Sequence, residues 1–392
     1  LMQAALDAGR RGEAVRLFQQ LRERLRIDLG VGPSKAAVAL HDRALAAEHV
    51  VPVSVSDRLR ASLAWGVVHL NSGEFAKAEK IARESREIAV GAGLDREMGE
   101  ATALLGIVSH MQGQWSTLFR SEIVEWVRAA PAFTSSIFDG HLCLAQFCLA
   151  SPGGAEQMVT IANELYALAE RSDSKPGCGL AALILGDLAL CQGRLEDAAE
   201  HLAQAERYHQ EAGAVSGCVM TLERMARLAL AHGDRAGARK LLEQAEGLVG
   251  KSWIASHLRI RLKALRVEAA PTLEAALDEI GEGDRTLSGA GQCQPCSMAF
   301  RAASALALVE AGELEQVSRR LDEAERLAAM WNGGCWVAAL WEARGVLRRA
   351  QGNEPRALAA FGEAAARFAE LGRPLDQDRC ARRMSEVAAS GE

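Results

Sequence analysis

Aromatic residues are scarce in this sequence, and tyrosine is nearly missing. Aromatic side chains make up 5% of the 392 residues, and only two of them are tyrosines. Alanine, leucine, glutamate and arginine recur throughout instead. Because strands draw on tyrosine, valine, isoleucine and threonine, this composition favours helices and argues against a β-sheet fold. We therefore expect an all-α protein.

Long apolar runs and an excess of basic charge are also missing. No stretch of about 18 uninterrupted apolar residues occurs, so we expect no membrane span. The chain opens at Leu1 without a signal peptide, and its nine cysteines are scattered, which predicts free thiols in a reducing cytoplasm. The formal net charge of −6 gives no basic field for nucleic acid. Hydrophobic residues make up 49% of the chain, which is enough to bury a core.

Motifs that carry catalysis or hold cofactors are missing as well. We find no Walker A sequence, no GxGxxG after a strand, no HExxH and no GxSxG. The pair Cys293 and Cys296 has the spacing of a zinc or redox motif, but neither a second such pair nor a βαβ pattern accompanies it. We therefore predict two structural thiols at a helix start, with a redox-sensitive pair as the alternative. The sequence predicts no enzyme, no cofactor and no metal site.

What the sequence does contain is a repeat of 40 residues. Glycines that follow apolar helical segments mark it at Gly73, Gly113, Gly153, Gly193, Gly233, Gly312 and Gly352, with one mark missing near Pro271. Seven residues before most marks stands a small residue: Gly66, Gly106, Gly186, Ala226, Ala305 or Gly345. Nine residues after the later marks stands a large one: Leu202, Leu242, Leu321 or Phe361. The glycine would end one helix in a left-handed turn, and the small residues would let two antiparallel helices approach closely. Each unit is thus a hairpin that must stack on its neighbours.

The pattern resembles the tetratricopeptide (TPR) family. The small residue, the turn glycine, the alanines at +5 and +12 and the large residue at +9 match its signature positions. The resemblance implies a right-handed α-solenoid of about eight hairpins over residues 57–390, with longer helices than usual. The unit from Gly140 to Gly177 is degenerate, and Ala270-Pro271 replaces one glycine.

The first 48 residues follow a different spacing. They predict a helix, a turn at Gly9, a second helix with an apolar face at Leu17, Leu21, Leu25 and Leu29, a break over residues 30–34, and a third helix capped by Ser34. The stretches LDAGRR at 6–11 and LGVGPS at 29–34 resemble the C-terminal part of the bacterial transcriptional activator domain of Streptomyces antibiotic regulatory proteins. Gly32 stands where that family often has glutamate. The resemblance implies that a DNA-binding winged helix precedes Leu1, so the chain is expected to be a fragment that meets DNA only through that domain.

The TPR resemblance also implies a ligand groove lined by the first helix of each hairpin. The position six residues before each turn glycine faces that groove in the family. Here it is occupied by Val67, Ile107, Phe147, Asp187, Arg227, Leu306 and Val346. Glu223 and Glu342 lie one helical turn earlier and face the same side.

Each of these positions also has a structural interpretation. Ile107 and Phe147 would otherwise be ordinary core residues. Asp187 and Arg227 would otherwise form a surface ion pair between neighbouring hairpins, or Arg227 would clamp an anionic group of a ligand. The functional alternatives therefore stay open at these positions.

We infer from these resemblances the sensing region of a bacterial transcription regulator, similar in architecture to maltose-regulator-type activators. Its groove would bind a small inducer or a protein or peptide partner. The alternatives are a TPR interaction scaffold and the regulatory tail of a signalling ATPase or cyclase. A closed pocket would favour a small molecule and an open trough a peptide. Whether the array forms a homodimer is left open by the sequence.

Overall fold

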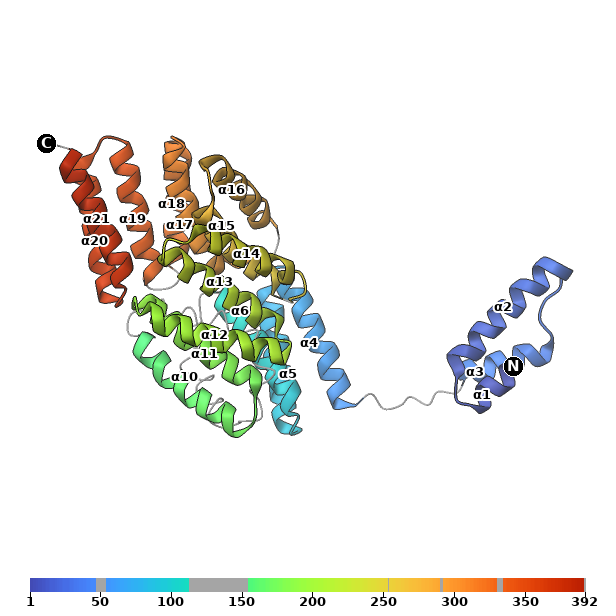
Figure 1. Ribbon diagram of the computed structural model, residues 1–392. Coiled ribbons are helices and arrows are strands. Elements are labelled where there is room, and N and C mark those ends of the chain that lie inside the picture. Colours follow the sequence, from blue (N-terminus) through green and yellow to red (C-terminus); the bar gives the residue numbers. More distant parts are fainter. Residues whose placement is uncertain (47–53, 113–153, 253, 290–291, 330–333, 391–392) are drawn as a thin grey trace. The chain divides into compact units, whose positions relative to one another are not determined.

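The computed structural model describes residues 1–46, 54–112, 154–252, 254–289, 292–329 and 334–390, and these form eighteen α-helices without a strand. The chain divides into two compact units, Leu1–Arg58 and Leu59–Glu392 (Figure 1). The expected all-α class is confirmed. None of the described helices combines the length and apolarity that crossing a membrane requires.

The first unit contains the three predicted helices, α1 (Met2–Asp7), α2 (Arg11–Leu29) and α3 (Lys35–Ala46). Gly9 and Gly30 adopt φ values of 70° and 64°, so both turns use the left-handed conformation that glycine adopts cheaply. The Ser34 hydroxyl accepts a hydrogen bond from the Ala37 N–H at 3.2 Å, which is the predicted cap of α3.

The interior of this unit is small. Ala5, Ala14 and Ala44 bring the three helices together, and the Phe18 ring stacks on His41 with centroids 4.1 Å apart. The predicted apolar face of α2 is only partly buried: Leu17 and Leu25 are half-buried, whereas Leu21 is 37% exposed and Leu29 is 68% exposed. The far half of α2 therefore presents apolar side chains that the described part of this unit does not cover.

The second unit is a series of antiparallel helical hairpins (Figure 1). Its helices are α4 (Val55–Asn71), α5 (Phe75–Gly91), α6 (Asp95–Met111), α10 (Gly154–Arg171), α11 (Lys175–Cys191), α12 (Leu195–Ala212), α13 (Val215–Ala231), α14 (Arg235–Val249), α15 (Ala255–Ala269), α16 (Leu273–Leu287), α17 (Gln294–Glu310), α18 (Leu314–Ala328), α19 (Cys335–Ala350), α20 (Glu354–Glu370) and α21 (Pro374–Ser390). Helix α5 contacts α6, and from α10 to α21 each helix contacts the next along the chain. The first helices of successive hairpins also contact one another, from α11 through α13, α15 and α17 to α19. This is the packing of a TPR-type solenoid.

The turn glycines behave as the repeat predicts. Gly73, Gly193, Gly233, Gly312 and Gly352 all have φ between 71° and 79°. Midway between them lies a second set of left-handed residues that the 40-residue spacing does not mark: Gly93, Gly213, Gly372 and Asp173, the last at φ 50°. The true structural period is therefore half the sequence period, one helix and one turn. Gly113, Gly153 and the first part of the degenerate unit, residues 140–153, lie outside the described residues.

The small and large residues of the repeat meet within one hairpin. A Cβ built on Gly345 would lie 2.4 Å from Cε1 of Phe361, and one on Gly186 would lie 2.9 Å from Cγ of Leu202. Both large side chains have no exposed surface. The missing glycine near Pro271 is replaced by a different turn, in which Thr272 caps α16 by accepting a hydrogen bond from the Ala275 N–H at 3.2 Å.

We expect Gly345→Ala to lower the free energy of unfolding by about 1 to 2 kcal/mol, because overpacking against Phe361 outweighs the gain in helix propensity. Gly362→Ala is the matched control, since Gly362 lies in α20 and a Cβ added there would meet no atom within 4 Å, and it should stabilise by about 0.5 to 1 kcal/mol. Urea unfolding of the two variants measures both effects. Equal stabilisation by both would contradict the close approach of α19 and α20.

Candidate ligand chamber

A cavity of about 790 Å³ lies among the first helices of the C-terminal hairpins. Residues of α11, α13, α15, α17, α19 and α21 line it, and we call it the chamber. The two ends of this series meet, because a Cβ built on Gly193, in the turn after α11, would lie 3.4 Å from side-chain atoms of Pro374 and Leu375 at the start of α21. Helices from both ends of the series, α11 and α21, therefore border the chamber.

Five residues that the sequence placed on the groove line this chamber. They are Asp187, Arg227, Leu306, Glu342 and Val346. The periodic position six residues before the turn glycine thus does identify the inner face from α11 onward.

The remaining predicted groove residues lie elsewhere. Ile107 has no exposed surface and belongs to the hydrophobic core, which is its structural alternative. Val67 is half-buried and packs against the same core. Glu223 is buried with 3% of its surface exposed and does not line the chamber. Phe147 lies outside the described residues.

Asp187 does not pair with Arg227. Its Oδ1 lies 2.8 Å from Nε of Arg224, a residue that the repeat register does not single out and that is 1% exposed. Arg224 occupies the position three residues before Arg227, almost one helical turn away, so the periodicity alone could not choose between the two. The charge of Asp187 is therefore already balanced within the protein.

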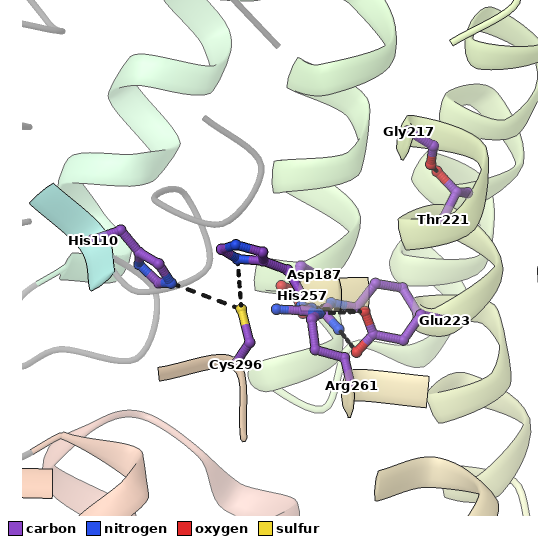
Figure 2. A network of polar contacts seen from close by, with 9 residues as sticks. His110, Asp187, Gly217, Thr221, Glu223, His257, Arg261 and Cys296 are labelled. Carbon is purple, nitrogen blue, oxygen red and sulfur yellow. Dashed lines mark hydrogen bonds and ion pairs between the residues drawn. The ribbon is translucent and has the colours of Figure 1, made fainter. Parts of the chain in front are cut away.

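Glu223 joins two buried arginines. Its Oε1 accepts a hydrogen bond from Nη1 of Arg224 at 2.6 Å, and its Oε2 accepts from Nε and Nη2 of Arg261 at 2.9 and 2.7 Å (Figure 2). Burial acts to raise the pKa of Glu223, but the two guanidinium groups outweigh it and lower that pKa to about 2. The group is therefore a charged structural network, which reaches the chamber wall at Arg224.

Arg227 is the exception among these charges. It is half-buried and lines the chamber, and within the described ranges its side chain forms no ion pair and no hydrogen bond. The exposed carboxylate of Glu268 also lines the chamber. Arg227 thus offers a guanidinium to the chamber that no carboxylate in the described structure binds directly.

The opposite wall is formed by α19 and α21. The buried Glu342 accepts hydrogen bonds from Nε and Nη2 of Arg379 at 2.7 and 2.6 Å and from Nε of Arg383 at 3.0 Å. Arg373 and Arg379 also flank Asp376; burial acts to raise the pKa of Asp376, but the two arginines lower it to about 2. The repeat register was read only as far as the glycine mark at Gly352, so the sequence pattern did not indicate these α21 residues.

The chamber combines charge with apolar surface. Leu306 of α17, Trp336 and Val346 of α19 and Phe368 of α20 contribute its apolar lining. Six arginines and five carboxylates contribute the polar part, so the arginines exceed the carboxylates by one. Small-molecule sites usually have a few polar groups among apolar walls, so this chamber is more highly charged than most.

A separate cluster brings together ligand-type side chains that line no part of the chamber. Cys293 caps α17 and Cys296 lies in its first turn, which is the helix start that the sequence predicted. His110 at the end of α6 places Nε2 at 3.1 Å from Sγ of Cys293 and 3.7 Å from Sγ of Cys296. Nδ1 of His257, in α15, lies 3.7 Å from the same Cys296 sulfur (Figure 2).

Similarity to known proteins is of two kinds, a family match at the start of the chain and a likeness of fold over nearly all of it. The family described as bacterial transcriptional activator domain matches residues 1–45. Among solved structures, a Rap protein complexed with competence and sporulation factor matches with a TM-score of 0.49 and 9% identity, over 86% of this chain and 98% of that one. An IFIT1 monomeric mutant with Gppp-AAAA matches with a TM-score of 0.45 and 12% identity, over 100% and 81%. The APC/C hetero-tetramer Cut9-Hcn1 matches with a TM-score of 0.32 and 13% identity, over 97% and 88%.

No curated protein matches this chain. The family match covers the same segment whose turns at Gly9 and Gly30 and whose cap at Ser34 the first unit displays. The repeat glycines and the paired small and large residues account for the hairpins that follow. The chain therefore carries a bacterial transcriptional activator domain at residues 1–45, followed by a long region of TPR-type helical hairpins, and is a region of a bacterial transcriptional regulator.

Proposed function

We propose that the TPR-type region is a sensor and that its chamber binds a small anionic inducer. The volume of about 790 Å³ lies in the range of small-molecule sites, and the meeting of the two ends of the helix series favours a compact ligand over an extended peptide. The observation that carries the proposal is Arg227, a half-buried guanidinium on the chamber wall without an ion-pair partner among the described residues.

A guanidinium recognises carboxylates and phosphates through two parallel hydrogen bonds. The arginines of the opposite wall are already held by Glu342 and Asp376, and Arg224 is held by Asp187 and Glu223. Of the two lining arginines that no described carboxylate binds, Arg235 is exposed, whereas Arg227 is half-buried and is the one we assign to a ligand. The apolar surface of Leu306, Trp336 and Phe368 would hold the rest of the molecule. The inducer is therefore expected to combine one anionic group with an apolar body.

Such a ligand would act by favouring one form of the array. It would contact Arg227 of α13 and the walls formed by α19 and α21, and so stabilise the arrangement in which α21 meets the turn after α11. A ligand shifts an equilibrium only by its difference in affinity for the two forms, and a few kcal/mol is sufficient. That shift is the signal that we propose the array transmits within the regulator.

The proposal is tested by thermal-shift and calorimetric screening of small carboxylates and phosphates, each paired with its neutral amide, ester or alcohol. We expect an anionic compound to bind, its neutral analogue to bind at least about tenfold more weakly, and Arg227→Ala to cause a similar loss. Arg285→Ala is the matched control, because it removes the same charge from a position of α16 that does not line the chamber. The affinity of Arg285→Ala for the anionic compound should equal that of the wild type.

Two outcomes would contradict the proposal. Equal binding of anionic and neutral compounds, or unchanged affinity in Arg227→Ala, would remove Arg227 from recognition. Binding of acidic peptides in place of every small compound would favour the second candidate, a groove for a protein partner, which helical-repeat architecture also supports.

A further inference from the structure

We propose that Cys293, Cys296, His110 and His257 form a structural zinc site. One donor atom from each residue, two sulfurs and two ring nitrogens, can be chosen so that all four lie within 4.8 Å of one another. Figure 2 shows the Cys296 sulfur between the two imidazole rings. Two thiols three residues apart and two histidines are a donor set that zinc binds tetrahedrally.

The distances fit such a tetrahedron. With bonds of about 2.3 Å to sulfur and about 2.0 Å to nitrogen, neighbouring donors in a tetrahedral site lie roughly 3.3 to 3.8 Å apart. The sulfur-to-nitrogen distances here are 3.1, 3.7 and 3.7 Å. Zinc binding therefore requires the four donor atoms to move by less than the 4.8 Å that spans the cluster. It requires no rearrangement of the helices.

The surroundings favour a closed structural site. The four residues are at most 3% exposed, so no position faces solvent for a substrate or an exchangeable water. The two thiols lie together at the N-terminus of α17, which fixes their spacing.

The donor chemistry also selects among metals. Sulfur and imidazole nitrogen suit zinc and exclude magnesium and calcium, which bind oxygen. A tetrahedral set of two sulfurs and two nitrogens is typical of zinc. The ion would tie the end of α6 to the starts of α15 and α17, and thus hold together hairpins whose donors are 183 residues apart in sequence.

The experiment is metal analysis of the full chain, purified under reducing conditions without a metal-affinity tag. We expect about one zinc per wild-type chain and at least a fivefold lower content in Cys296→Ser, since one lost thiolate opens the site. Cys178→Ser is the matched control, because Cys178 is also buried but lies outside the cluster, and it should retain the zinc.

A second measurement keeps the test decisive if Cys296→Ser fails to fold. Zinc is removed from the wild-type protein with a chelator, and Co²⁺ is then titrated into the reduced protein. Tetrahedral visible bands with thiolate-to-cobalt charge transfer, reaching saturation at one equivalent, are expected, together with a melting temperature that zinc restores and Mg²⁺ does not. A reduced wild-type chain that takes up neither zinc nor cobalt would overturn the proposal, as would a Cys293–Cys296 disulfide in the native protein.

Discussion

Replacing Glu223 by glutamine is expected to lower the free energy of unfolding by about 3 to 5 kcal/mol, because it removes the negative charge between two desolvated guanidinium groups. Arg224 and Arg261 are 1% and 3% exposed, and both bind the Glu223 carboxylate. Glutamine keeps the shape and one acceptor oxygen, so the loss isolates the charge. Asp187 continues to balance Arg224, whereas Arg261 loses its ion pair with Glu223.

Chemical denaturation of the wild type and of Glu223→Gln measures the difference between their free energies of unfolding. The matched control is Glu84→Gln, which removes a carboxylate from an exposed ion pair with Lys80. The side chain of Glu84 is 60% exposed and that of Lys80 is 74% exposed. Such exposed pairs contribute about 0 to 1 kcal/mol, so the control should unfold almost like the wild type. A loss below about 1 kcal/mol in Glu223→Gln would show that water reaches the network and would contradict its burial.

Acidification from pH 6.5 to pH 4 is expected to cost about 3 kcal/mol of stability through His209 alone, at about 1.36 kcal/mol for each unit of pKa. Burial lowers the pKa of His209 from 6.5 in the unfolded chain to about 4 in the fold. Between these values the unfolded chain binds the proton and the native protein does not, so stability falls as the pH falls. The contribution is fully present above pH 6.5 and is lost as the pH approaches 4.

The physical cause is the tight environment of this ring. A Cβ on Gly179 or on Gly217 would lie 2.5 Å from Cδ2 of His209, and Nδ1 of the ring lies 3.0 Å from Oγ1 of Thr221. The measurement is the pH dependence of urea unfolding for the wild type and His209→Gln, whose difference isolates this group. His232→Gln, a change in the turn after α13, should keep the full dependence. Parallel curves for wild type and His209→Gln would refute the assignment.

The sequence was sufficient for the hairpins because their determinants are local. A turn glycine, a small residue seven positions earlier and a large residue nine positions later act within one hairpin, as Gly345 and Phe361 illustrate. The second set of left-handed turns, which lies between the hairpins, was harder to detect in the sequence. One of these turns has Asp173 in the left-handed conformation in place of a glycine. The spacing of leucines in α2 predicted an apolar face, but it did not predict that Leu29 on that face is exposed.

The candidate sites depend on contacts between distant hairpins, which spacing does not encode. The face of each helix was predictable, so Asp187 and Arg227 line the chamber, but the choice of Arg224 as the partner of Asp187 depends on how neighbouring helices are rotated. The Cys293 and Cys296 pair was visible, whereas the two histidines beside it come from α6 and α15, which are far from it in sequence.

A crystal structure of the full chain with the tightest-binding anionic compound tests the central claim most directly, that the C-terminal hairpins surround a ligand chamber. The account predicts the anionic group within hydrogen-bond distance of the Arg227 guanidinium, with Leu375 packed beside Gly193. A ligand bound outside these helices, or an open array in which Leu375 and Gly193 are far apart, would contradict it.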